Sequence, residues 1–522
     1  MTLDSDVFDV VVLGTGLAQS IAAAALAKAG RTVLHLDPNE YYGGEQASLT
    51  LDELATWVSE RASANSSSTS RYVASQRITY THASATPLTP ALQADRRRYA
   101  LSLFPSLMPS RGALIDTLIH SDVAKYIEFK LLNGVHIAFG SSFERVPGSK
   151  EDVFKDKSIS LPEKRKLMKA LLFAGGEFED DPLLAGREGE PVLSFLKSAF
   201  GLSDKLAQAI AYALAFADVD EPALPALRRA RGYLRSMGRY GPSPFLVGQY
   251  GGAGEVAQGF CRACAVFGGT YILGSEGAPS DIVVGDVGEK GGAGEGAGVS
   301  LRIDAHPSPI RAKHLLAPPG FLQEPGVTRT TAHLIAIATC QPAVLRKRAD
   351  ESESESAVEP DDDTAVLVFP PGDGPLVRAL VMGAGTGSCP PGQWVVYLSA
   401  TTSGEPDPKA LLAPYLARIT DAVFVAAYLQ HSPEPEPESE GPASEEVGAP
   451  ASEAEEVSGV AAGAESTDAA PVVTLRPYAG THTLTEGVEH EAREGARAFR
   501  ALCADAFFPH EDDDDDDDDD DE

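Results

Sequence analysis

The stretch from Phe8 to Leu49 places the strongest constraint on what this chain can fold into. An apolar, β-branched run at Phe8–Leu13 is broken by two glycines, an Ala-rich run follows at Ile21–Lys28, and a second apolar run ends at Asp37. This order predicts a strand, a tight turn, a helix and a second strand. In such a βαβ unit the helix N-terminus faces a crevice with its free amides and the positive end of its dipole.

The turn carries part of a dinucleotide-binding fingerprint. Gly14 and Gly16 supply the tight turn, and Asp37 stands 21 residues after Gly16, where an acidic side chain accepts from a ribose hydroxyl. The third glycine of the fingerprint is replaced by Gln19, whose side chain would stand about where the phosphates lie. The four residues therefore predict a vestigial loop, built but without a nucleotide, although a GxG turn alone is equally compatible with a purely structural role.

Two motifs in this stretch resemble a known family. GTGLAQS at Gly14–Ser20 and YYGG at Tyr41–Gly44 are similar to the Rab GDP-dissociation inhibitor and Rab escort protein family. Members of that family keep a flavoprotein-like domain without binding flavin and carry an amide or carboxylate at the position of Gln19. The resemblance therefore implies a protein with no cofactor.

Further blocks resemble the same family. They are Tyr99–Lys130, Val146–Phe173, Leu234–Leu273 with its GRYG at Gly238–Gly241, and, faintly, Thr481–Phe508. The second block, with VPGSKEDVF followed by EKRKLMKAL, is closer to the escort branch than to the dissociation inhibitors. The third is one residue longer than in the family, just before Glu255.

The predicted fold class is α/β: an FAD/NAD-binding-like domain with mixed sheets, as in the dissociation inhibitors, plus an inserted all-α domain. We expect residues 1–111, 232–430 and 471–510 to form the first domain and 112–231, which shows no clear strand pattern, to form the helical one. Residues 431–470 are a predicted disordered acidic insert and 511–522 an acidic tail. Strands are predicted at Asp281–Val284, Val299–Ile303, Thr270–Leu273, His333–Thr339, Ala365–Phe369, Val377–Met382 and Trp394–Ser399, and helices at Glu255–Val266, Pro406–Leu429 and Glu486–Phe507.

The net charge of -33 is local. Residues 350–363, 433–468 and 511–522 are acidic without any Lys or Arg and account for 31 of the 33 charges, so the rest is close to neutral. This disfavours nucleic acid as a partner. Five cysteines give no disulfide framework, and neither a signal peptide nor a membrane-length apolar run is visible, so we expect a cytoplasmic protein.

The sequence offers no catalytic residues. Cys261 and Cys264 have CxxC spacing, but no second pair exists, so two buried side chains are favoured over a metal or redox site. No HExxH, GxSxG or GxxxxGK[ST] pattern occurs. We therefore expect no metal site and no enzymatic activity of the chain itself.

What the sequence offers instead is a surface for another protein. Family members place a Rab-binding platform where this chain has Tyr42, Glu255, Arg262 and Thr270, with Arg239 as an additional candidate. An exposed aromatic side chain beside an acid and a base suits recognition of a partner loop. The alternatives are structural: Tyr42 only fills the unused crevice, and Glu255 only favours its helix N-terminus.

The resemblance also implies partners and a role. They are GDP-bound, unprenylated Rab GTPases, the catalytic heterodimer of Rab geranylgeranyltransferase, the isoprenoid tail of the prenylated Rab, and transient peripheral contact with membranes. The isoprenoid would enter a groove in the helical domain, although leucines there are more often simply core. The alternatives are a GDP-dissociation inhibitor role within the family and, from another class, a flavin-dependent oxidoreductase.

Overall fold

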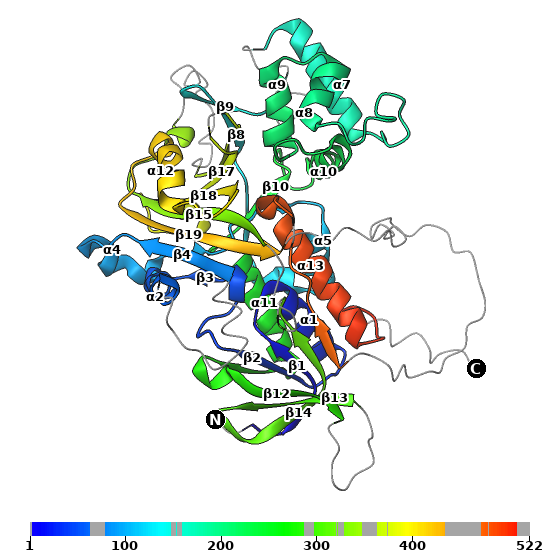
Figure 1. Cartoon of the computed structure of the whole chain (residues 1–522), viewed down its shortest axis with the longest axis vertical. Coiled ribbons are helices and arrows are strands. Elements are labelled where there is room, and N and C mark those ends of the chain that lie inside the picture. Colours follow the sequence, from blue (N-terminus) through cyan, green and yellow to red (C-terminus); the bar gives the residue numbers. More distant parts are fainter. Residues whose placement is uncertain are drawn as a thin grey trace, which may run out of the picture.

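The computed structural model describes residues 3–62, 79–147, 153, 159–286, 297–319, 321, 328–346, 363–372, 374–433, 471–478 and 480–508. Along its longest axis the helices α7 to α10 lie at one end, a large sheet that carries α12 comes next, and a second large sheet lies at the other end (Figure 1). The expected α/β fold with mixed sheets is confirmed. The helix N-termini and loops between these layers provide the candidate site.

The sheet at the far end contains the predicted βαβ unit. In spatial order its strands are β11 (Thr270–Leu273), β2 (Val33–Asp37), β1 (Val7–Leu13), β14 (His306–Ala317), β13 (Ala297–Ile303) and β12 (Pro279–Asp286), and β20 (Val472–Thr474) also pairs with β14. Strands β11, β2, β1 and β14 run parallel, with Val10 opposite Val33, whereas β12, β13 and β14 form an antiparallel meander. Parallel strands of this kind are buried on both faces, which explains their continuous β-branched runs.

Helix α1 (Leu17–Lys28) packs on this sheet together with α11 (Ala253–Val266), α13 (Thr483–Leu502) and α5 (Ala113–His120) (Figure 1). Its many alanines allow close approach of the neighbouring helices. A Cβ atom added at Gly495 of α13 would lie 2.9 Å from the Ala18 carbonyl oxygen and 2.9 Å from Ile21 Cβ, so α13 crosses α1 with backbone near backbone. The first and last described helices are thereby held together.

The second large sheet is the one next to the helices α7 to α10. Its order is β4 (Tyr80–Ala85), β19 (Phe424–Pro433), β15 (Thr328–Ala338), β18 (Trp394–Thr402), β17 (Val377–Gly383), β16 (Thr364–Phe369), β8 (Val135–Phe139) and β9 (Ser142–Arg145). Helix α12 (Pro408–Ile419) covers one face. Smaller sheets join β6 (Met108–Pro109), β10 (Phe245–Gly248) and β7 (Phe129–Leu131), and β3 (Ser48–Leu49) with β5 (Leu101–Ser102).

The helical part contains α7 (Leu161–Gly175), α8 (Val192–Phe200), α9 (Asp204–Gln208), a π-helical turn at Ala209–Leu214 and α10 (Ala223–Ser236). Ser160 begins α7 with the expected capping pair, since the Glu163 carboxylate accepts from the Ser160 hydroxyl at 2.8 Å. Arg378 of β17 donates to the Phe216 and Ala217 carbonyl oxygens at 2.7 and 2.9 Å. This arginine ties the helical part to the second large sheet.

The remaining helices are short or peripheral. They are α2 (Leu51–Ala62) and α4 (Pro90–Asp95) beside the second large sheet, and 3-10 turns at Gly44–Gln46, Arg96–Arg98, Val123–Tyr126, Ser275–Gly277, Ala343–Leu345 and Ala384–Thr386. Among the described residues, no helix combines the length and the apolar character needed to cross a membrane.

Three sequence expectations are wrong in part. Residues 112–231 are not helical throughout, because 129–145 form β7, β8 and β9, which pair with β10 and β16. The helix expected over Pro406–Leu429 ends at Ile419, and Phe424–Leu429 belong to β19. The expected disordered insert begins too early, since His431 still pairs with Thr330.

The physical reason is shared by these errors. Short strands that are buried on both faces, or that pair with distant segments, show no period-2 alternation, and the alanines of β19 favour helix in isolation. We propose that the helical unit spans residues 161–236 and that the rest of the described chain forms the other unit. The predicted segments 434–470 and 511–522, and most of the acidic stretch 350–363, lie outside the described residues.

Candidate functional site

The predicted glycine turn connects β1 to α1. Gly14 has a φ of 88°, a left-handed conformation that glycine adopts without strain, and its N–H donates to the Leu36 carbonyl at 2.8 Å. Helix α1 begins directly after Gly16, as expected for a dinucleotide-binding unit. The frame of a cofactor site is therefore present.

The amides that would bind a pyrophosphate already have partners in the protein. The Leu17 N–H donates to Gln46 Oε1 at 3.0 Å, and the Ala18 N–H donates to Glu491 Oε2 at 3.3 Å. Burial, helped by the neighbouring carboxyl of Glu45, raises the pKa of Glu491 to about 8. Side chains from a loop and from α13 thus satisfy the N-terminus of α1 from inside the fold.

Gln19 fills the space along the same turn. Its side chain is buried and folds back on the loop, so that a Cβ atom added at Gly16 would lie 2.6 Å from Gln19 Oε1 and 3.0 Å from Gln46 Oε1. A pyrophosphate in contact with this turn would have to displace both amides. The residues present do not fit a bound dinucleotide.

Asp37 is also engaged within the protein. Its carboxylate accepts from the Thr15 N–H and hydroxyl at 2.9 and 2.7 Å, and from the Asn39 N–H and side-chain amide at 2.8 Å each. Burial raises its pKa, and these hydrogen bonds act in the opposite direction. The side chain that would bind a ribose instead holds the turn after β2.

Thr15 connects the filled crevice to the YYGG motif. Its hydroxyl donates to Asp37 and accepts from the Gly43 N–H at 3.0 Å. Gly43 has a φ of 100°, and a Cβ atom there would lie 2.9 Å from the Ala47 Cα, so this position requires glycine. The interior network therefore fixes the turn that carries Tyr42.

Tyr42 lies at the outer edge of the sheet. Its ring contacts Tyr271 of β11 edge to face, with centroids 5.7 Å apart, and Tyr271 contacts His35 at 4.7 Å in the same geometry. Thr270, the first residue of β11, is half-buried beside it. Tyr42 is half-buried rather than fully exposed as expected, because Tyr271 covers one side of its ring.

Glu255 and Arg262 share one face of α11. They are separated by seven residues, which is two helical turns, and Gln258 lies between them on the same stripe. Arg262 is exposed, with its guanidinium 4.6 Å from the ring centroid of Tyr126, whereas burial of the half-exposed Glu255 raises its pKa. Tyr42 adjoins this helix near Cys261, since the thiol affects the pKa of the Tyr42 hydroxyl.

The structure therefore brings four of the five expected surface residues to α11 and the adjoining sheet edge. Arg239 is anchored differently: its guanidinium donates to the Ser110 carbonyl at 2.8 Å and lies 3.8 Å from the Asp116 carboxylate at the start of α5. It belongs to the β6–α5 connection.

The CxxC pair is buried in α11. Ser20 Oγ and Cys261 Sγ are 3.2 Å apart, and burial raises the pKa of the two thiols to about 12 for Cys261 and about 11 for Cys264. Thiols of this kind are inert toward metals and disulfides. All five cysteines are free, and within the described part of the chain no cluster of His, Cys, Asp and Glu could hold a metal.

Sequence reasoning missed Gln46 and Glu491, the two side chains that complete α1. The signal for Glu491 is visible in retrospect: Glu489 and Glu494 also stand on the buried side of α13, and Glu489 accepts from the Ala113 N–H at 2.6 Å at the start of α5. Buried carboxylates on one helix point to helix N-termini or cations as partners. Gln46 gave no comparable signal.

Comparison with known proteins agrees with this arrangement. Residues 3–79 and 80–361 match the family profile "GDI: GDP dissociation inhibitor". Because the match extends over more than half of its length, the chain belongs to this family. The resemblance inferred from the motifs is confirmed.

Individual relatives are more specific. The chain is 31% identical over 407 residues to Rab proteins geranylgeranyltransferase component A of Saccharomyces cerevisiae, covering 76% of this chain and 62% of the relative. It is 32% identical over 320 residues to the protein of the same name from Drosophila melanogaster, covering 60% of each. The chain thus spans about three fifths of the length of these relatives.

A second group of relatives carries another name. The Rab GDP-dissociation inhibitor of Saccharomyces cerevisiae is 28% identical over 347 residues, covering 65% of this chain and 68% of the relative. Among solved structures, the Rab GDI of Plasmodium falciparum superposes with a TM-score of 0.63 at 17% identity, covering 95% of this chain and 98% of that one. This likeness establishes the fold.

Proposed function

We propose that this protein is a Rab escort protein, the non-catalytic component A of Rab geranylgeranyltransferase. It binds newly made, GDP-bound Rab GTPases, presents their C-terminal cysteines to the catalytic heterodimer, and carries the prenylated product to membranes. It works in the cytoplasm with transient peripheral membrane contact. The carrying observation is a cofactor frame whose interior amides are taken by Gln46 and Glu491 while the adjoining outer surface remains accessible.

The chemistry of that surface supports a protein partner. Tyr42 offers one open side of its ring, Arg262 a positive charge held over Tyr126, and Glu255 a carboxyl that has lost part of its hydration. A partner cation would restore that solvation through a charge-assisted hydrogen bond, and aromatic and Arg side chains are the usual hot spots of interfaces. We assign Tyr42, Glu255, Arg262 and Thr270 to the Rab contact and Arg239 to its periphery.

We place the isoprenoid of the product in the helical unit. Its interior is lined by large apolar side chains, and several hydrophobic residues of α7 and α8 are only half-buried (Met168, Leu171, Phe173, Leu193). Transfer of an alkyl chain into such a layer is favourable by about 0.8 kcal/mol per methylene. Separation of α7 from α8 would expose this lining without disturbing α11.

The test is reconstituted prenyl transfer. Purified Rab, the catalytic heterodimer and geranylgeranyl diphosphate are incubated with and without this protein, and incorporation of the prenyl group is measured. We expect transfer only when the protein is present, and binding of GDP-loaded Rab to exceed binding of GTP-loaded Rab. Equal transfer in both incubations would refute the proposal.

The second candidate is a Rab GDP-dissociation inhibitor, which is favoured by the relative of that name from Saccharomyces cerevisiae. The two functions differ in the state of Rab that binds more tightly. An escort protein captures unprenylated Rab, whereas a dissociation inhibitor prefers the prenylated form, so competition between the two forms distinguishes them. A flavin oxidoreductase is disfavoured, because Gln19 and Gln46 occupy the space along the glycine turn.

A further inference from the structure

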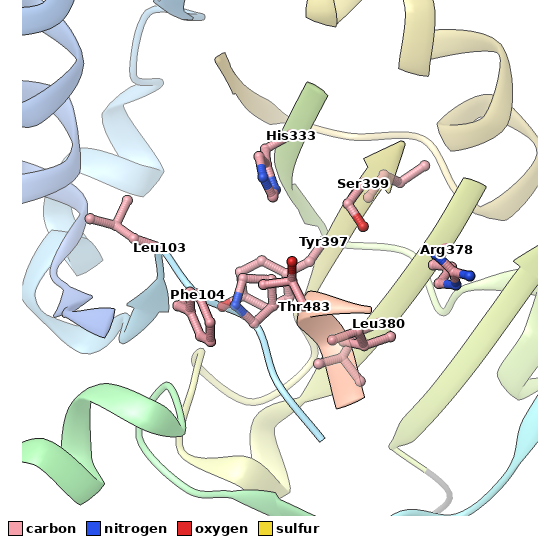
Figure 2. Close-up of a pocket in the computed structure, with 11 residues that line it drawn as sticks. Leu103, Phe104, His333, Arg378, Leu380, Tyr397, Ser399 and Thr483 are labelled. Carbon is pink, nitrogen blue, oxygen red and sulfur yellow. The ribbon is translucent and has the colours of Figure 1, made fainter. Parts of the chain in front are cut away.

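A cavity lies between the second large sheet, the segment after β5 and the start of α13. Figure 2 shows Leu103, Phe104, His333 and Ser399 around the ring of Tyr397, with Leu380, Arg378 and Thr483 nearby. The empty volume is about 360 Å³, part of which opens to solvent. This is room for a molecule of about a dozen non-hydrogen atoms, at the dimensions typical of small-ligand sites.

Three polar side chains form a row on the floor of this cavity. His333 of β15 and Arg378 of β17 are both paired with Ser399 of β18, so the three residues stand side by side on one face of neighbouring strands. The next row inward is apolar, with Leu380 paired with Tyr397. Neighbouring strands are about 4.8 Å apart, so the two ends of the row are about 10 Å apart.

Arg378 supplies an unused donor at one end. One terminal nitrogen of its guanidinium donates to the Phe216 and Ala217 carbonyls and to Asp218 at 2.7, 2.9 and 2.9 Å. Its Nε–H is buried and has no hydrogen-bond partner among the described residues, although the whole residue is only 8% exposed. Buried polar groups without partners are rare in proteins and call for an acceptor.

His333 supplies an acceptor at the other end. Its Nε2 is 2.9 Å from Gln430 Oε1, which requires the ring proton at Nε2 and leaves a lone pair at Nδ1. Burial lowers the pKa of His333 to about 4, so the ring is neutral near pH 7. The ring stacks on Tyr428, with centroids 5.1 Å apart, which fixes its orientation.

We propose that this cavity binds a small neutral molecule with an apolar, preferably aromatic, body, a hydrogen-bond acceptor at one end and a hydroxyl at the other. The acceptor takes the Arg378 Nε–H, the hydroxyl donates to His333 Nδ1, and the body lies over Tyr397 and Leu380. An anion is excluded as the preferred ligand because Asp218 already neutralises the guanidinium. Phe104 and Leu484 close the cavity on the side opposite the sheet.

The test uses three matched probes and the full chain: 4-hydroxyacetophenone, acetophenone without the hydroxyl, and p-cresol without the carbonyl. Affinities are measured by ligand-observed NMR titration at pH 7. We expect 4-hydroxyacetophenone to bind at least about tenfold more tightly than either analogue, since each lacks one hydrogen bond. Equal affinities, or no binding of the first probe up to about 10 mM, would overturn the proposal.

Two variants locate the binding. Ser399→Leu places an isobutyl group in the middle of the polar row and should lower the affinity for 4-hydroxyacetophenone at least about tenfold. Thr401→Leu makes a comparable change two residues further on the same strand face, outside the cavity lining, and should leave the affinity within about twofold. Should Ser399→Leu fail to fold, Leu380→Trp fills the same cavity, and unchanged binding by a folded filling variant would refute the assignment.

Discussion

Helices α1 and α11 both follow a strand and a glycine turn, yet they use their surroundings in opposite ways. The N-terminus of α1 is enclosed, and its amides are bound by Gln46 and Glu491. In contrast, α11 keeps a solvent-facing stripe that carries Glu255 and Arg262. The comparison teaches that a cofactor frame can lose its ligand to the protein's own side chains while the outside of the same sheet remains available for recognition.

The largest effect is expected on the exposed helix. Arg262→Glu reverses the charge over Tyr126 and should weaken binding of GDP-loaded Rab by about 2 kcal/mol or more, roughly thirtyfold in Kd, without lowering Tm. Isothermal titration measures the affinity. Arg302→Glu, at another exposed arginine on β13, is the control and should bind normally; equal losses in both variants would mean that α11 has no special role.

The link between the two regions is broken by Thr15→Val. The variant keeps the shape of the side chain but removes a hydrogen bond to the buried Asp37 and the acceptor of the Gly43 N–H. We expect a loss of about 2 to 3 kcal/mol in the free energy of unfolding, measured in urea, and weaker Rab binding because the Tyr42 turn is released. Thr56→Val, at an exposed position on α2, should change neither quantity.

The enclosed helix should respond to pH through Glu491. A carboxyl whose pKa rises from 4.5 to about 8 on folding binds more protons in the folded state, so stability falls as pH increases between these values. Glu491→Gln removes this dependence. We expect similar Tm values for variant and wild type near pH 5, and a variant Tm about 2 °C or more higher above pH 8.

Glu489, whose pKa burial raises to about 7, contributes a slope of the same sign in both proteins, so only the difference between them reports on Glu491. A Tm difference that does not change between pH 5 and pH 8.5 would show that the carboxyl is ionised throughout this range.

The smallest effect concerns Gln19. Gln19→Gly restores the missing glycine, but Gln46 and Glu491 still hold the amides of Leu17 and Ala18, so the purified variant should show no visible flavin absorbance. The cost in stability is about 1 kcal/mol for a glycine in a helix. A yellow variant would mean that this one side chain alone excludes the cofactor.

Local patterns were sufficient for much of the fold. The first βαβ unit, the capped start of α7 and strand β11 over Thr270–Leu273 could be located because apolar periodicity, capping residues and glycines specify them within a few neighbouring positions. The same holds for the turn that carries Tyr42. These features depend on contacts that are short in sequence.

Distant pairings could not be predicted in the same way. Strand β14 at His306–Ala317 was missed because its alternation is interrupted by prolines and charged residues near its start, and β19 because its alanines resemble a helix. At the site, the roles of Gln46 and Glu491 follow only from tertiary packing. The surface residues were named from a family resemblance, and their contact with Rab stays a prediction.

The bond between Ala18 and Glu491 has a consequence for biosynthesis. The acceptor for one of the first helical amides is made 473 residues later, so α1 cannot reach its final state while the ribosome is still producing the middle of the chain. A nascent polypeptide that stops before α13 leaves two helix N-termini, those of α1 and α5, without their carboxyl partners. Premature termination anywhere upstream is thus felt at the very beginning of the molecule.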